Sequence, residues 1–138
     1  MKIILNKCFG GFGLSKNAHE LYAEKKGMKV YEYYQDYRKG FDCFKKGDSG
    51  LFKSYFTKDF GEEIELNDEE YNKYCLNLTS ENRTDKTLIE VVEELGQKAN
   101  NGFSELEVVE IPDNSFYKID EYDGIETIYY SDAEIKEK

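Results

Sequence analysis

A helical stripe of apolar residues between residues 85 and 100 places the firmest constraint on the fold. Apolar side chains recur there at spacings of three and four, and glutamates fill the positions between them; the stripe consists of Leu88, Val91, Val92, Leu95 and Ala99. This spacing is typical of a helix with one buried face. Thr84 or Asp85 can cap its start, and Gly96 weakens it near its end, because glycine costs about 1 kcal/mol inside a helix. Such a helix has to bury its apolar face, and we expect the rest of the chain to supply a sheet.

Short β-rich segments, separated by turn residues, occupy much of the remaining chain. Ser15 is a good N-cap for a second helix, which we expect to end at Gly27. Asp123-Gly124 joins two β-rich runs and is a strong hairpin signal. The further segments expected to form strands are residues 2–5, 29–34, 51–57, 63–66 and 106–111, and a short helix is expected after Asn67. We therefore predict an α+β fold: a mostly antiparallel sheet of about five to seven strands with two principal helices packed on it.

The length of 138 residues suits a single domain spanning residues 1–138. Within it, residues 35–49 are predicted to form a long loop or hairpin, and residues 132–138 a frayed tail. Twelve tyrosines and nine phenylalanines argue against disorder. No apolar run approaches the length of a membrane span, and the N-terminal run is too short for a signal sequence. We expect a cytoplasmic protein that does not contact a membrane.

Cysteine and histidine are too few for several kinds of site. The chain has three cysteines, an odd number, and no CxxC motif; they are Cys8, Cys43 and Cys75. We therefore expect reduced thiols, with neither a disulfide framework nor a zinc site. His19 is the only histidine. No two of the many carboxylates are marked as a catalytic acid and base. We predict a non-enzymatic protein with no metal and no cofactor; a nucleophile formed by Cys8 and His19 is the weaker alternative.

The charge of the chain is unevenly distributed. The net charge is −10; residues 1–61 hold 12 Lys and Arg against 7 Asp and Glu, whereas residues 62–138 hold 7 against 22. Such a balance repels nucleic acid and attracts basic partners, so direct binding of DNA or RNA is not expected. The carboxylates expected to form an acidic partner-binding face are Glu107, Glu110, Asp120, Glu121, Asp123 and Glu126. The alternative is a solubilising surface.

A glycine-rich turn at residues 9–13 lies between the first strand and the first helix. Backbone N–H groups at such a position can bind phosphate. The residues that could form a nucleotide or phosphate site are Lys7, Gly10, Gly11, Gly13, Ser15 and Lys16. The turn matches neither the dinucleotide fingerprint nor the Walker sequence, so a tight structural turn is the alternative.

Aromatic and basic residues are interleaved between residues 29 and 60. This stretch holds ten aromatic residues and seven Lys or Arg. Such a surface can stack on bases or form the hot spot of a protein interface. The residues expected to be exposed in it are Tyr34, Tyr37, Arg38 and Phe41. The alternative is a sheet core flanked by solvated charges.

Five stretches of sequence together carry a family resemblance: residues 6–15 (NKCFGGFxLS), 83–85 (RTD), 91–100 (VVEELGxxAN), 108–113 (VVEIPD) and 121–126 (EYDGIE), where x marks positions outside the match. They resemble a family of small proteins from phages and prophages of low-GC bacteria. The resemblance covers roughly residues 1–30 and 83–128. It implies a small phage accessory protein, and many such proteins counter bacterial defence systems.

These observations lead to a ranked set of functional predictions. We predict a phage-encoded protein that inhibits a bacterial defence component, most concretely a CRISPR effector, by stoichiometric binding; its acidic face would occupy a basic surface that normally holds nucleic acid. A nucleotide-binding sponge that sequesters a defence signal is the alternative, followed by a small enzyme or a virion protein. An exposed sheet edge could also pair two copies of the chain as a homodimer.

Overall fold

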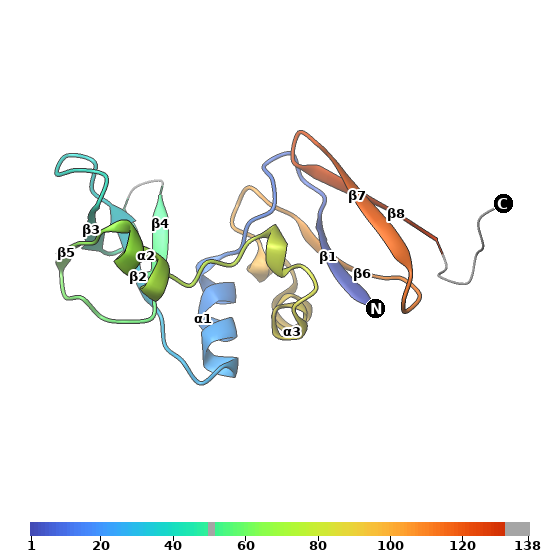
Figure 1. Ribbon diagram of the computed structural model, residues 1–138, viewed down its shortest axis with the longest axis horizontal. Coiled ribbons are helices and arrows are strands. Elements are labelled where there is room, and N and C mark those ends of the chain that lie inside the picture. Colours follow the sequence, from blue (N-terminus) through green and yellow to red (C-terminus); the bar gives the residue numbers. More distant parts are fainter. Residues whose placement is uncertain (50–51, 132–138) are drawn as a thin grey trace. The chain divides into compact units, whose positions relative to one another are not determined.

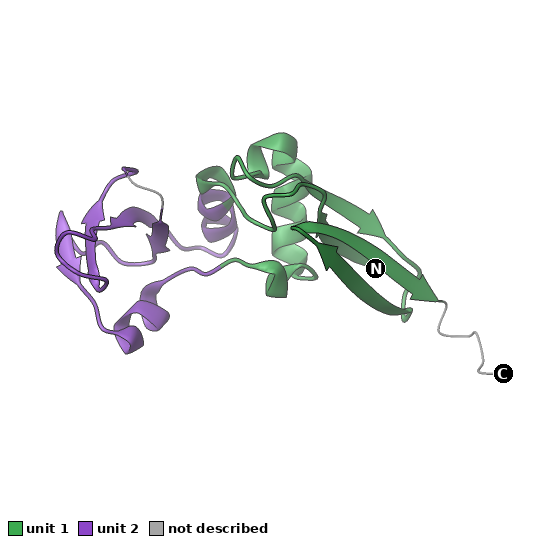
Figure 2. Ribbon diagram, turned by 90° about the horizontal axis from the view of Figure 1, so that it is seen from above, with its two compact units in different colours: residues 1–18, 78–138 green, residues 19–77 purple. Residues whose placement is uncertain are grey.

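The computed structural model describes residues 1–49 and 52–131, which fall into two compact units (Figures 1 and 2). Unit 1 combines residues 1–18 with residues from 78 onward, and unit 2 comprises residues 19–77. The described residues form three α-helices and eight strands, and every strand pair is antiparallel. The predicted α+β class is confirmed. The single domain spanning residues 1–138 stays a prediction.

Unit 1 contains two pairs of strands and the amphipathic helix. Its elements are β1 (Lys2–Asn6), β6 (Leu106–Glu110), β7 (Phe116–Tyr122), β8 (Ile125–Ser131), α3 (Lys86–Leu95) and the first residues of α1 (Lys16–Lys25). β1 pairs with β6, and β7 pairs with β8. One face of the β7–β8 hairpin packs on the β1–β6 pair through Ile119 and Ile128, which contact a core of Ile3, Leu5 and Ile111. The apolar face of the hairpin is thereby covered.

The local signals around α3 are confirmed. Asp85 caps the helix, and its carboxylate accepts hydrogen bonds from the backbone N–H groups of Thr87 and Leu88. Of the predicted apolar stripe, the helix buries Leu88, Val91 and Val92, whereas Leu95 is half-buried and Ala99 is buried in the turn after the helix. The helix ends at Gly96, whose φ of 57° combined with a ψ of −126° is favourable only for glycine. The chain continues as a 3-10 turn, Gly96–Ala99, so the predicted helix is interrupted at the glycine.

Unit 2 is a four-stranded sheet with one short helix. The strand order is β4 (Lys53–Phe56), β2 (Tyr31–Gln35), β3 (Cys43–Lys46) and β5 (Glu63–Glu65), and α2 is Asp68–Tyr74. Asn67 begins α2 with a complete capping box. The core is mostly aromatic, with Tyr33, Phe44, Phe56 and Leu66 buried and further rings packed around them.

The described strands form three sheets, and the second edge of β1 is closed by groups other than a strand. The backbone N–H of Ile4 donates to Arg83 O (3.0 Å), and the N–H of Asn6 donates to the Glu126 carboxylate (2.8 Å). The predicted loop or hairpin at residues 35–49 contains the β2–β3 connection and all of β3. The predicted frayed tail, residues 132–138, lies outside the described residues, as does the start of the strand predicted at 51–57. No helix in the described part of the chain is long and apolar enough to cross a membrane.

Candidate functional site: an aromatic cluster and groove in unit 2

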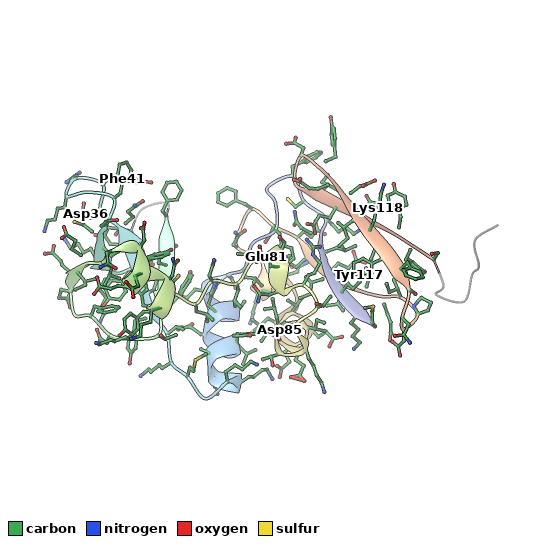
Figure 3. All side chains as sticks on the ribbon, in the orientation of Figure 1. Asp36, Phe41, Glu81, Asp85, Tyr117 and Lys118 are labelled. Atoms are coloured by element: carbon green, nitrogen blue, oxygen red, sulfur yellow. The ribbon has the colours of Figure 1, made fainter. Side chains whose placement is uncertain are left out.

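Three exposed aromatic residues of unit 2 form a cluster in which one ring contacts the other two. Tyr37 and Phe41 lie in the connection between β2 and β3, and Phe52 lies just before β4. The Tyr37 ring meets both others edge-on, with ring centroids 6.0 Å from Phe41 and 5.7 Å from Phe52. The three are 52%, 76% and 59% exposed. We call Tyr37, Phe41 and Phe52 the aromatic cluster; Figure 3 labels Phe41.

A groove of about 540 Å³ lies beside this cluster. Phe41 and Phe52 contribute to its lining, and the buried residues Phe44 and Leu66 contribute apolar surface. A polar pair also lies in the lining: the Ser54 and Tyr71 hydroxyl oxygens are 3.0 Å apart. The remaining lining residues are Gln35, Asp42, Lys53 and Asp68. Aromatic surface with a few polar groups and this volume are typical of a binding site.

Hydrogen bonds hold the loop that carries Tyr37 and Phe41. The side-chain amide of Gln35 donates to Phe41 O (2.6 Å), and Asp42 O accepts from the backbone N–H of Leu66 (2.9 Å). Asp36 O accepts from the N–H groups of Lys39 and Gly40. Both ends of the loop are thus tied to the sheet, and the cluster is presented by an ordered loop, which reduces the entropy lost on binding.

The charge of the groove favours a neutral or cationic group over an anion. Asp42 and Asp68 are exposed carboxylates in its lining, against one ammonium group, that of Lys53. A tyrosine hydroxyl is neutral at physiological pH, and burial raises the pKa of Tyr71 further above its ordinary value. The groove therefore offers two carboxylates, hydroxyl groups and aromatic faces.

The predicted aromatic–basic surface is brought together only in part. Tyr37 and Phe41 belong to the cluster. Tyr34 precedes the groove residue Gln35 on β2, and successive residues of a strand point to opposite faces, so Tyr34 lies on the other face of the sheet. Arg38 is exposed in the same loop as Tyr37. Phe52, Ser54 and Tyr71 were not predicted to share a site, since only the folded sheet brings them together.

The glycines of the glycine-rich turn allow close packing within the protein. A Cβ at Gly10 would collide with the backbone of Phe103, and a Cβ at Gly124 would collide with the backbone of Phe9 and Gly11. The tip of the β7–β8 hairpin therefore rests directly on the turn. This favours the structural interpretation of the turn over the phosphate site.

Several groups predicted to bind phosphate have partners within unit 1. The Lys7 ammonium donates to Glu126 O (3.3 Å), and the Gly11 N–H donates to Cys8 O (3.3 Å). The Ser15 hydroxyl donates to Lys98 O (2.6 Å) and caps α1 by accepting from the N–H of Ala18 (3.1 Å). Gly13 is packed against the side chain of Asn101, and Lys16 begins α1.

The predicted acidic residues do not form one face. Glu107 and Glu110 are exposed, but they are three residues apart and therefore lie on opposite faces of β6. Asp120 and Glu121 are adjacent on β7, so they also point to opposite faces of their strand. Asp123 is at the hairpin turn. Glu126 is a correction to the prediction, because its side chain is only 7% exposed and forms an ion pair.

The partner of Glu126 is Arg83, which lies two residues before the helix cap Asp85. Two guanidinium nitrogens of Arg83 contact the two carboxylate oxygens of Glu126, at 3.0 and 2.8 Å. Arg83 also donates to the carbonyl oxygens of Ser80 and Ile4, and its guanidinium lies 5.3 Å from the centre of the Phe12 ring. This pair has a structural role: it joins β8 to β1.

The cysteines and the histidine do not assemble a site among the described residues. Cys8, Cys43 and Cys75 are free thiols, and burial is the main cause that raises the pKa of Cys43 and Cys75. The His19 ring is buried and stacks on Tyr55, with centroids 4.1 Å apart. Nor does the described part of the chain gather three His, Cys, Asp or Glu side chains that could hold a metal ion.

Comparisons of this chain with known protein families, with characterised proteins and with solved structures find no match.

Proposed function

We propose that this chain acts by stoichiometric binding to a protein, and that the aromatic cluster and the groove beside it are the binding surface. The partner is a bacterial defence protein, most concretely a CRISPR effector, and this choice of partner rests on the sequence resemblance to phage proteins. The choice of surface rests on one observation: three large aromatic side chains are held together by an ordered loop and stay exposed.

The energetics of protein interfaces support this surface. Aromatic residues are enriched in interface hot spots, where a few side chains contribute most of the binding energy. Phe41 is 76% exposed in this chain, so a partner that covers it gains apolar burial. The groove next to it can accept a side chain of the partner.

The charges around the groove support a basic partner. An Arg or Lys side chain that entered between Phe41 and Phe52 would meet the carboxylates of Asp42 and Asp68 and the faces of the rings. The net charge of −10 would also accelerate association with a basic protein. The acidic composition then contributes to steering, while the aromatic cluster makes the contact.

Affinity purification from defended bacteria tests the proposal. The tagged chain is used as bait, and the eluate is analysed by mass spectrometry for proteins and nucleotides. We expect one defence protein at stoichiometric amounts, and we expect the double variant Phe41→Ala, Phe52→Ala to reduce its recovery at least about ten-fold. Phe103→Ala, which truncates an exposed aromatic residue of unit 1, is the matched control and should retain the partner.

A charge-reversal variant distinguishes the aromatic surface from the acidic one. Asp120, Glu121 and Asp123 are all replaced by Lys. We expect the partner to be retained at low salt, with slower association. If this variant loses the partner while the Phe41, Phe52 variant keeps it, the acidic hairpin is the binding surface and the proposal is wrong.

A nucleotide sponge is the second candidate, and the volume and aromatic lining of the groove are what favour it. A ring could stack on Phe41 or Phe52, but the carboxylates of Asp42 and Asp68 oppose a phosphate. Titration calorimetry with cyclic dinucleotides and ADP-ribose derivatives tests it. We expect no heat; a heat that is lost in Phe52→Ala would favour the sponge over the inhibitor.

A further inference from the structure

The hairpin of β7 and β8 leaves one long strand edge without a partner in the described part of the chain. β7 spans seven residues, and its sheet contains β8 as the only other described strand. Most β7 side chains are exposed. Open edges of this length pair readily with another strand, and proteins usually block them.

The turn determines which β7 residues present their backbone groups to this edge. Asp123 and Gly124 both have positive φ, 52° and 93°, as a two-residue type I′ turn requires. The flanking pair, Tyr122 and Ile125, is then hydrogen-bonded, and every second residue of β7 from Tyr122 faces β8. Tyr117, Ile119 and Glu121 therefore direct their N–H and C=O groups away from β8.

The other strand of the hairpin supports this assignment. Glu126 is opposite Glu121 in the register, so its carbonyl should also point away from the hairpin. Glu126 O accepts a hydrogen bond from the Lys7 ammonium at 3.3 Å, as expected for an outward carbonyl.

We propose that two copies of this chain pair antiparallel along β7, with the two-fold axis at Ile119. The two hairpins then form one four-stranded antiparallel sheet in the order β8, β7, β7, β8. This inference is independent of the proposed function, because it uses unit 1 alone.

The sequence of β7 is self-complementary in this register. Ile119 is opposite Ile119 of the second copy, and Lys118 is opposite Asp120 of the second copy, twice by symmetry. Within one chain, Lys118 and Asp120 already lie on one face, with their charged atoms 3.7 Å apart. Lys118 and Asp120 form non-hydrogen-bonded pairs with the second copy, in which opposing side chains come closest.

The outer positions of β7 complete the match. Phe116, which is 69% exposed, lies opposite Tyr122 of the second copy, which is 80% exposed. Successive residues of a strand, such as Tyr117 and Lys118, which Figure 3 labels, point to opposite faces. Phe116, Lys118, Asp120 and Tyr122 are each two residues apart, so the charged pairs and the Phe116–Tyr122 pairs lie on one face. A lysine on an edge strand normally opposes pairing, but here the second copy supplies its counter-charge.

Sedimentation analysis of single and mixed variants tests this register. We expect the unmodified chain to show a monomer–dimer equilibrium with a dissociation constant below about 1 mM. Lys118→Asp places Asp opposite Asp, and Asp120→Lys places Lys opposite Lys, so each variant should weaken the dimer about ten-fold or more. An equal mixture of the two variants restores opposite charges across the axis and should recover a heterodimer.

Lys98→Asp is the control, because it makes the same charge change at an exposed site of unit 1 away from β7. Circular dichroism checks that every variant stays folded. A monomer at all concentrations overturns the proposal. So does a dimer that neither single variant weakens, or a mixture that stays monomeric while both variants are folded.

Discussion

The cores of unit 1 and unit 2 are built from different kinds of side chain. The hairpin core of unit 1 is aliphatic, built from Ile3, Leu5 and Ile111. The core of unit 2 is mostly aromatic, and rings such as Tyr33, Phe44 and Phe56 meet edge to face or tilted. The two units also satisfy their buried polar groups in different ways.

Unit 1 closes the second edge of β1 with a charged pair instead of a strand. Arg83 and Glu126 bond to backbone groups at the open edge of β1 as well as to each other. Unit 2 uses hydroxyl groups on its core rings: Tyr33 OH donates to Gly61 O (2.7 Å) and accepts from the N–H of Phe60 (2.9 Å). A buried ion pair is costly to break on one side, whereas a hydroxyl can be removed at lower cost.

The largest expected effect comes from breaking the ion pair of unit 1. Arg83→Met leaves the Glu126 carboxylate buried without its counter-charge, and the free energy of unfolding should fall by about 3–5 kcal/mol. Hydrogen exchange measured along the chain should show the loss in unit 1. The double variant Arg83→Met, Glu126→Gln should recover most of the lost stability, because it leaves no unpaired charge. A double variant as unstable as Arg83→Met alone would show that the loss comes from packing and not from charge.

A smaller effect is expected from removing one hydroxyl in unit 2. Tyr33→Phe keeps the ring but leaves the Phe60 N–H without its acceptor, and stability should fall by about 1–3 kcal/mol. Urea unfolding and hydrogen exchange measure the loss, which should concentrate in unit 2. Tyr37→Phe is the control at an exposed position and should change stability by less than about 0.5 kcal/mol. Equal losses in the two variants would contradict this role of Tyr33.

The third effect is a loss of stability at high pH. Burial, reinforced by the Glu32 charge, raises the pKa of Tyr55 well above its ordinary value of 10.0, and burial also raises the pKa of Tyr71. Above about pH 10 the folded state therefore keeps protons on these hydroxyl groups that the unfolded state releases. As the pH rises from the unfolded-state pKa of such a group to its folded-state pKa, the free energy of unfolding falls by about 1.4 kcal/mol per pH unit. These groups contribute no pH dependence below that range.

Unfolding in urea across a series of alkaline pH values measures this effect. Tyr55→Phe removes the largest contribution and should flatten the decline relative to the unmodified chain. A decline of equal slope in Tyr55→Phe would assign the alkaline sensitivity to other groups.

Local signals in the sequence were sufficient for the boundaries of several elements. Asp85, Asn67 and Ser15 cap helices as predicted, and Asp123-Gly124 forms the predicted hairpin turn. Each of these depends on hydrogen bonds or backbone angles within a few residues, which the sequence pattern shows directly.

The candidate sites could be predicted only in part. Tyr37 and Phe41 were identified because they belong to one aromatic stretch, but the contact of Tyr37 with Phe52 depends on the pairing of β2 with both β3 and β4. Glu126 was assigned to an acidic surface because several residues near it in the sequence are also acidic. Arg83 is 43 residues away in the sequence, so the ion pair that buries Glu126 had no local signal.

The sequence by itself determined the α+β class, the main helices and the hairpin, because each follows from periodicity, caps and turn residues. Only the tertiary structure decided which charges and rings are exposed. Side chains along a strand alternate between its faces, so a cluster of like residues in sequence is divided between two surfaces. Whether either surface stays open depends on what distant segments pack against it, and here that packing buries Glu126 and leaves Phe41 and Phe52 exposed.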